Sequence, residues 1–214
     1  MTALASAPAV RLLRPRREHL GAYLAALDRG WSPDNVRKTA AAEEHRRQIA
    51  TDADAFLALM DDPEAAGGPV TLPDGTTQPR IPSLRRWIWD GDDAHGADGF
   101  AGSIGLRWTK DGSPLPPHVL GHIGYAVVPW KQRRGLATQA LALMLEIARG
   151  RGMQEAEITI DPDNLASQKV IERNGGRLVE RFDKGAAYGH ATGLRYRIDL
   201  RNGSTNPCMD RSAA

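Results

Sequence analysis

The stretch Gly121-His-Ile-Gly-Tyr-Ala-Val-Val-Pro-Trp-Lys-Gln-Arg-Arg-Gly-Leu-Ala137 decides how this chain folds. A strand ends within it just before Pro129, because proline has no N–H to donate to a neighbouring strand. A basic turn follows, and apolar residues then recur at helical spacing. The stretch therefore predicts a strand at His118–Val128, a tight turn, and a helix at Ala137–Ala148.

The turn between strand and helix has the chemistry of a di-anion site. The first N–H groups of a helix have no partners inside it and lie at the positive end of its dipole. Small residues let these groups approach an anion such as pyrophosphate. A basic turn without a ligand is the alternative that this turn alone leaves open. A P-loop and a Gly-x-Gly-x-x-Gly turn are both missing. The expected donors are Gln132, Arg133, Arg134, Gly135, Leu136, Ala137 and Thr138.

The composition is that of an ordinary globular protein, with 41% hydrophobic and 25% charged residues in a chain of 214. Twenty-eight basic and 26 acidic residues leave a formal charge of +2. The basic residues are scattered, so we expect no nucleic-acid partner. Cys208 is the only cysteine, which excludes an intrachain disulfide. No apolar segment approaches the length of a membrane span, and we expect a soluble cytoplasmic protein.

The order of the remaining segments predicts a mixed α/β or α+β sheet with at least one crossover in its second half. The Gly- and Pro-rich segment 63–82 has too few apolar residues for a core. We expect it to be a loop or hairpin inserted in a single domain, 10–200, with flexible termini at 1–9 and 201–214. The other expected strands are Val10–Pro15, Arg85–Trp89, Phe100–Trp108, Glu157–Ile160, Leu178–Phe182 and Leu194–Leu200, and the other expected helices are Glu18–Arg29, Val36–Ala50, Ala53–Met60 and Ser167–Arg173.

Two patterns suggest a metal site, and both fail. The acidic residues between Asp90 and Gly99 lack the spacing, the central glycine and the distal glutamate of a calcium loop. His118 and His122 are four strand residues apart, roughly 13 Å. That separation is too large for two ligands of one ion, so we expect no metal.

Two motifs resemble the GCN5-related N-acetyltransferase (GNAT) superfamily. In that family a strand ending in Val-x-Pro leads to Gln/Arg-x-x-Gly-x-Gly/Ala and a helix, as 127–129 and 132–137 do here. Asn164-Leu-Ala-Ser167, followed by a short helix and Asn174-Gly175, is similar to the family's Asn-x-x-Ala/Ser element. The resemblance covers 99–200 well and 10–89 only by element order. It is greatest to bacterial proteins predicted to be acetyltransferases that carry a Gly-His-Ile-Gly-Tyr strand.

The resemblance implies a GNAT-like central sheet, mixed and mostly antiparallel, splayed between its strands 4 and 5 and flanked by helices. The first splayed strand carries a bulge, and the pantetheine arm of acetyl-CoA pairs with it like an added strand. Carried over, the backbone of Val127 and Val128 binds pantetheine, and the Val127 N–H polarises the thioester carbonyl. Residues 132–138 hold the pyrophosphate. Asn164 and Ser167 contact pantetheine or the departing sulfur, although Asn164 also suits plain helix capping.

Acetyl transfer to an amine needs a base, because a lysine-type amine has a pKa near ~10.4. The family's usual glutamate falls on Gly121 here. The adjacent His122 titrates near neutral pH and is either the base or a histidine that only pairs with the neighbouring strand. The family's frequent general acid, a tyrosine, is replaced by Ile171. Tyr188 is the first substitute for it and Tyr125 the second.

Together these features predict an acetyl-CoA-dependent N-acyltransferase that acetylates a primary amine by direct attack in a ternary complex. The alternative is a non-catalytic acyl-CoA-binding regulatory domain, because Gly121 and Ile171 occupy the usual base and acid positions. The expected partners are acetyl-CoA and a small-molecule or peptidyl amine, with no membrane. Family members commonly dimerise through their final strands, so a homodimer is the assembly to test for.

Overall fold

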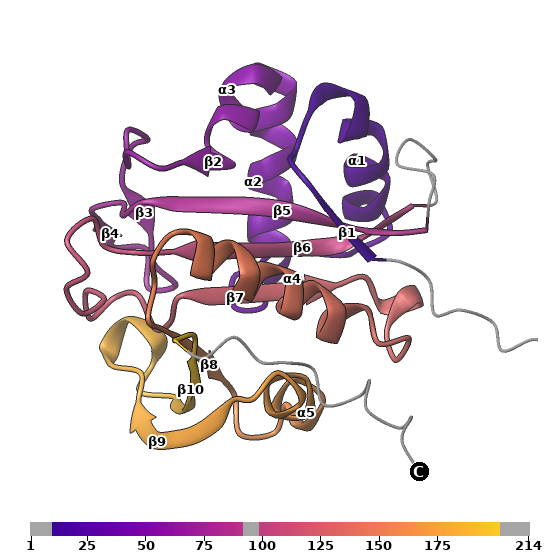
Figure 1. The fold of residues 1–214 in the computed structure, drawn as a ribbon. Coiled ribbons are helices and arrows are strands. Elements are labelled where there is room, and N and C mark those ends of the chain that lie inside the picture. The colour runs from indigo at the N-terminus through magenta and orange to yellow at the C-terminus, as the bar shows by residue number, and fades with distance from the viewer. Residues whose placement is uncertain (1–9, 92–98, 202–214) are drawn as a thin grey trace, which may run out of the picture.

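The computed structural model describes residues 10–91 and 99–201. The termini expected to be flexible lie outside this part of the chain, except for Arg201. Cys208 and most of the polar turn after Asp90 also lie outside it. Figure 1 shows a larger sheet crossed by helices and a smaller sheet beside it.

The strands and helices follow the order expected from the sequence. The strands are β1 (Val10–Leu13), β2 (Asp61–Asp62), β3 (Val70–Thr71), β4 (Thr77–Gln78), β5 (Ser83–Asp90), β6 (Phe100–Arg107), β7 (Ile123–Val127), β8 (Glu155–Ile160), β9 (Arg177–Asp183) and β10 (Thr192–Asp199). The helices are α1 (Leu20–Asp28), α2 (Lys38–Thr51), α3 (Ala53–Ala58), α4 (Leu136–Gly150) and α5 (Leu165–Arg173), with short 3-10 turns η1 (Arg17–His19), η2 (Pro129–Lys131) and η3 (Ala186–Tyr188).

The strands form two sheets that separate between β7 and β8. The larger sheet has the order β1-β5-β6-β7, with β2 also pairing with β5, and the smaller has the order β8-β10-β9. All pairings among the described strands are antiparallel. The separation is the splay that the resemblance implied. The β3–β4 hairpin lies inside the segment expected to be an insertion.

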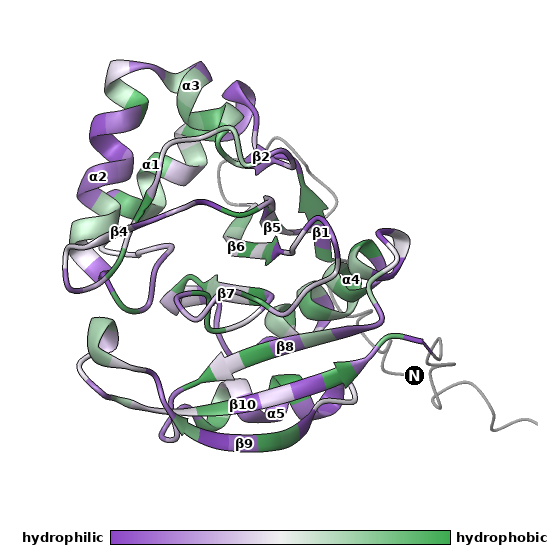
Figure 2. Cartoon of the chain, turned by 90° about the vertical axis from the view of Figure 1, so that its left-hand side faces the viewer, coloured by the Kyte–Doolittle hydropathy of each residue, from purple (hydrophilic) through white to green (hydrophobic). Residues whose placement is uncertain are grey.

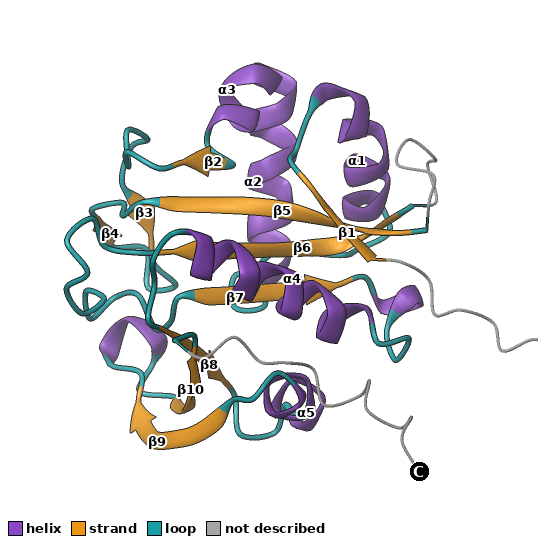
Figure 3. Ribbon diagram, viewed as in Figure 1, coloured by secondary structure: helices purple, strands orange, loops and turns teal. Residues whose placement is uncertain are grey.

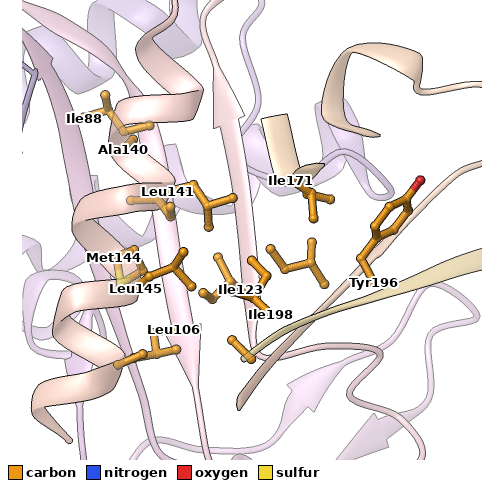
Figure 4. Close-up of a cluster of buried hydrophobic side chains, with 14 of the residues drawn as sticks. Ile88, Leu106, Ile123, Ala140, Leu141, Met144, Leu145, Ile171, Tyr196 and Ile198 are labelled. Carbon is orange, nitrogen blue, oxygen red and sulfur yellow. The ribbon is translucent and has the colours of Figure 1, made fainter. Parts of the chain in front are cut away.

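Helices cover both faces of the larger sheet, with α1–α3 on one side and α4 on the other (Figures 2 and 3). Figure 4 shows the apolar face of α4 packed against residues from both sheets. Leu141 and Met144 of α4 are fully buried in one cluster with Ile123 of the larger sheet and Ile198 of the smaller. Helix α4 therefore holds the two sheets together.

A second core cluster lies under α1–α3 on the opposite face. Trp87 and Trp89 are fully buried there. The ring of Tyr23 from α1 stacks on Trp87 with a centroid distance of 4.6 Å. Such aromatic pairs stabilise a fold beyond the area that they bury.

The strand expected at 118–128 is shorter in the structure. Only Ile123–Val127 forms a strand. Just before it, His122 bonds to both sides, and its carbonyl accepts from the Arg107 N–H of β6 over 2.8 Å. The His122 N–H donates to the Glu157 carbonyl over 2.7 Å. A Cβ on Gly121 would lie 3.0 Å from the same carbonyl oxygen. The two sheets therefore meet here, at one end of the splay.

The expected bulge also lies elsewhere. The register of β7 with β6 is regular along the whole strand. The irregularity falls in the neighbouring pair of strands, β5 and β6. There β6 has one extra residue opposite the step from Ile88 to Trp89 of β5. The expectation of a bulge in the first splayed strand was wrong, because Gly102 with φ +144° brings the β6 backbone against Ala126 without disturbing β7.

Candidate active site

The last residues of β7 present to the splay a backbone edge with which no described strand pairs. The Val128 N–H donates to the Ala101 carbonyl over 2.9 Å, so Val128 faces β6. Successive residues of an antiparallel strand alternate between the two sides, so Tyr125 and Val127 direct their N–H and C=O groups away from β6. Val128 was expected to bind pantetheine as well. That expectation is corrected, because its N–H lies inside the sheet and its carbonyl accepts from Lys131.

Two side chains confirm the outward direction of these carbonyls. The Asn35 amide donates to the Tyr125 carbonyl over 3.4 Å, and the Gln132 amide donates to the Val127 carbonyl over 3.1 Å. An extended ligand that pairs with this edge could donate to the same two carbonyls in place of the Asn35 and Gln132 amides. Gln132 therefore lies between the strand edge and the turn that follows it.

The turn before α4 is built to expose backbone N–H groups. Gly135, the N-cap of α4, has φ +79° and no side chain to cap the helix. Arg133 also has a left-handed φ, of +63°. Within the described residues, no N–H group from 133 to 138 donates a hydrogen bond. A left-handed residue followed by a helical one forms a concave nest of N–H groups that suits an anion.

The two arginines of this turn have different surroundings. The Arg134 guanidinium lies 2.7 Å from a carboxylate oxygen of Asp90, which Lys131 also approaches at 3.4 Å. The Asp90 side chain is 7% exposed, so this is a buried anchor that holds the turn against β5. Arg133 is exposed and forms no ion pair within 10–91 and 99–201. Arg133 thus remains a candidate phosphate contact, while Arg134 contributes its backbone N–H. Nothing in the sequence pattern singled out Asp90.

Helix α5 forms the opposite wall of the splay. The side-chain Oδ1 of Asn164 accepts from the Ser167 N–H over 3.1 Å, so Asn164 caps α5. Capping explains this asparagine without a ligand, and a contact to pantetheine stays a prediction. Sequence reasoning placed Asn174 only at the end of the motif and missed its side-chain contacts. Its amide donates to the Thr138 and Val170 carbonyls at 3.2 and 2.8 Å. It ties the end of α5 to the first turn of α4.

The two tyrosines expected as general acids lie in different places. The Tyr125 hydroxyl donates to the Ser167 carbonyl over 3.5 Å, which places it across the splay from β7 to α5. Burial raises the pKa of Tyr125 to about 12. The Tyr188 hydroxyl donates to the His118 carbonyl over 3.1 Å, near the β3–β4 hairpin. Ile171 is fully buried in the core. Tyr125 is therefore the tyrosine that lies beside the expected sulfur position.

His122 joins the two sheets where they meet. Its Nδ1 accepts from the Glu157 N–H over 3.0 Å. A neutral ring that accepts at Nδ1 carries its proton on Nε2 and has no second lone pair for a substrate proton. The pKa of His122 is lowered by burial first, raised by Glu157, and lowered again by Arg107. This geometry favours the pairing role over the base, and the catalytic role stays a prediction.

Residues 46–177 match the family model of the acetyltransferase (GNAT) domain. The chain belongs to the GNAT family. Membership makes it an N-acetyltransferase, and it accounts for the splay between β7 and β8 and for the basic turn before α4.

Solved GNAT structures share this fold over most of their length. RimL, the ribosomal L7/L12 alpha-N-protein acetyltransferase in complex with coenzyme A, is 16% identical and covers 89% of this chain and 93% of its own, with a TM-score of 0.56. A protein from Bordetella pertussis assigned to the GnaT family is 17% identical over 88% and 94%, with a TM-score of 0.52. MccE, the microcin C7 self-immunity acetyltransferase in complex with acetyl-CoA and AMP, is 12% identical over 89% and 92%, with a TM-score of 0.50. No curated protein matches the chain in sequence.

Other features lie outside this GNAT site. A surface hollow lined by residues of β1 and η1 lies at the far edge of the larger sheet from β7. Among the described residues, no three His, Cys, Asp or Glu side chains are grouped to hold a metal ion. In the same part of the chain, no helix is long and apolar enough to cross a membrane.

Proposed function

We propose that this GNAT enzyme transfers the acetyl group of acetyl-CoA to a primary amine, in a small molecule or a peptide, by direct attack in a ternary complex. The observation that supports it most is the outward edge of Tyr125 and Val127 beside the uncapped N–H groups before α4. In this proposal pantetheine pairs with the strand edge, and pyrophosphate binds the N–H groups before α4. The coenzyme A bound to RimL supports the choice of cofactor.

The chain's residues have distinct roles in the transfer. The neutral amine nitrogen attacks the thioester carbon, the C–S bond breaks with its electron pair going to the CoA sulfur, and the nitrogen loses its proton to water. The Val127 N–H points into the splay and stabilises the negative charge that develops on the carbonyl oxygen. The Tyr125 hydroxyl, protonated at neutral pH, donates a hydrogen bond to the departing thiolate.

Calorimetric titration with acetyl-CoA tests the cofactor site. Gly135→Glu places a carboxylate among the N–H groups that hold pyrophosphate, and we expect micromolar binding to be lost. Gly152→Glu is a matched control, because Gly152 has the same φ of +79° at the other end of α4 with open space around it. Equal affinity in wild type and Gly135→Glu would contradict the site. Loss in both variants would point to backbone strain instead.

Turnover separates the enzyme from a domain that only binds acyl-CoA. We expect CoA release from acetyl-CoA with at least one member of a panel of primary amines. Binding without release across the panel would favour the regulatory alternative. The acetylated product, identified by mass, then shows which nitrogen reacts.

A further inference from the structure

Two arginines lie on the face of the larger sheet that α1–α3 cover. Arg85 is on β5, two residues before the buried Trp87 and on the same face. It pairs in register with Gly105 of β6, and Gly105 pairs with Gly124 of β7. Arg107 follows Gly105 by two residues, so its side chain also projects from this face. We call Arg85 and Arg107 the arginine pair.

The side chains of the arginine pair flank the paired glycines. The Arg85 guanidinium reaches along β6 to the Ser103 hydroxyl, at 3.4 Å. A Cβ built on Gly124 would lie 3.5 Å from Nη2 of Arg107, so that guanidinium covers Gly124. The two glycines have no side chains of their own. Two cationic groups therefore lie over a bare part of the sheet beside β7.

Neither member of the arginine pair forms an ion pair with the described residues. The contrast with Arg86 is informative, because that neighbour projects from the opposite face and binds Asp61 at 3.4 Å. The acid that faces Arg107 is Asp34, and its carboxylate already accepts from the backbone N–H groups of residues 36 and 37. Two guanidinium groups and one carboxylate leave a local charge of about +1.

The surroundings of Arg107 leave its positive charge poorly compensated. Arg107 is exposed to water. Nevertheless, protein atoms around its guanidinium lower its pKa, and the repulsion from Arg85 lowers it further. The charge of Arg107 also lowers the pKa of Tyr188, against the larger effect of burial, so the η3 turn borders this place.

The arginine pair lies on the side from which the amine must approach. The expected pyrophosphate turn begins α4, so the cofactor occupies the α4 side of the sheet. The α1–α3 side remains for the acceptor. Gly124 precedes Val127 by three residues, which is about 10 Å along a strand. An anion at the arginine pair would therefore lie about 10 Å, three residue lengths, from the reacting carbonyl.

We propose that the arginine pair binds a carboxylate of the acceptor, so that the acceptor is an amine with a carboxylate two to three residue lengths from its nitrogen. A peptide with an acidic third residue has this form. The guanidinium fork matches a carboxylate in shape, and the local charge of about +1 matches a carboxylate rather than a dianionic phosphate. The inference rests on the proposed acetyl transfer and adds its substrate class.

The test compares three tripeptide amides, Ala-Ala-Asp, Ala-Ala-Asn and Ala-Ala-phosphoserine, as acceptors. We expect kcat/KM for the Asp peptide to exceed that for the Asn peptide at least tenfold. In Arg107→Gln and Arg85→Gln the preference should shrink to within about twofold while the acetyl-CoA affinity stays unchanged. Arg86→Gln, the matched control on the opposite face, should keep the preference.

Several outcomes would overturn the inference. Equal kcat/KM for the Asp and Asn peptides in wild type would do so, as would a preference that persists in both arginine variants. If kcat/KM were larger for the phosphoserine peptide than for the Asp peptide, the ligand of the arginine pair would be a phosphate and not a carboxylate. If no peptide is acetylated, the proposed acetyl transfer to peptides is wrong, and this result says nothing about the arginine pair. In that case, calorimetric titration with the Asp peptide tests the arginine pair without turnover. Weaker binding to Arg107→Gln than to wild type would support the pair, and equal binding would contradict it.

Discussion

The two sheets differ in how completely they are covered. The larger sheet has helices on both faces; its central strand β6 is almost wholly buried, and every residue of β5 is buried or partly buried. In the smaller sheet, β9 is exposed along nearly its whole length, and Leu178 and Val179 of that strand are 53% and 48% exposed. The first sheet is a packed frame, whereas the second depends on α4 and α5 for most of its burial.

This difference shows how the candidate site is divided. The packed frame supplies the backbone edge of Tyr125 and Val127, which on the proposed function must keep a fixed direction to polarise a carbonyl. The less covered half supplies Ser167 and the start of α5. The largest effect is expected from a change at the junction of the two halves, a smaller one from the Tyr125 hydroxyl that spans them, and the smallest from His122, which only joins them.

Gly121→Glu should have the largest effect. A Cβ on Gly121 would lie 3.0 and 3.1 Å from backbone atoms of Glu157 and Thr159, so a side chain there pushes the sheets apart. We expect the free energy of unfolding in urea to fall by about 3 kcal/mol. The variant restores the family's glutamate, yet it should not raise activity.

A matched glycine controls for the added charge. Gly150, at the end of α4, has no neighbouring atom within 4 Å of the position that a Cβ would take. Gly150→Glu should therefore change the free energy of unfolding by less than about 0.5 kcal/mol. If Gly121→Glu were as stable as Gly150→Glu, the close approach of the sheets at Gly121 would be wrong.

Tyr125→Phe should lower kcat by about a hundredfold, because it removes the donor beside the leaving sulfur. The KM for acetyl-CoA should not change, since the backbone edge is intact. Tyr188→Phe is the comparison, and it should leave kcat within about threefold because its hydroxyl binds the His118 carbonyl. Steady-state kinetics on both variants decide. The reverse pattern would assign the acid to Tyr188 and to the loop of the smaller half.

His122→Gln should have the smallest effect on catalysis. Glutamine can still accept from the Glu157 N–H, so we expect kcat to fall less than about threefold, far from the ~10²–10⁴-fold of a lost general base. An acidic limb that disappears from the pH–rate profile of the variant would instead establish His122 as the base.

The pH dependence of stability checks the same residue. Burial lowers the pKa of His122 in the folded protein below its ordinary 6.5. The unfolded chain therefore binds a proton first as the pH falls through about 6.5, and wild type loses stability there. His122→Gln should lose less stability over that range in urea unfolding. Equal losses would show that the lowered pKa has no measurable consequence.

Much of the fold could be predicted because its signals are local. Pro129 ends β7, helical spacing marks α4, and a Gly- and Pro-rich composition marks the segment that contains the β3–β4 hairpin. The turn before α4 was likewise readable from Gly135 and its neighbours. Such signals depend on residues close in the chain.

The rest depends on residues far apart in the chain. Asp90 anchors Arg134 and Asn174 binds the Thr138 carbonyl, and neither contact leaves a spacing that a sequence pattern could show. The direction of the Val127 N–H depends on register with β6, which a shift of one residue would reverse. The expectation for Val128 was wrong for this reason.

The open edge of β7 also connects the protein to metabolism. On the proposed function, acetyl-CoA completes hydrogen bonding that the chain leaves unfinished between its sheets. A ligand that binds only the folded state stabilises it in proportion to the logarithm of its concentration, so above saturation each doubling of free acetyl-CoA adds ~0.4 kcal/mol. The lifetime of this enzyme in a cell would then follow the supply of its own acetyl donor, and carbon starvation would shorten it.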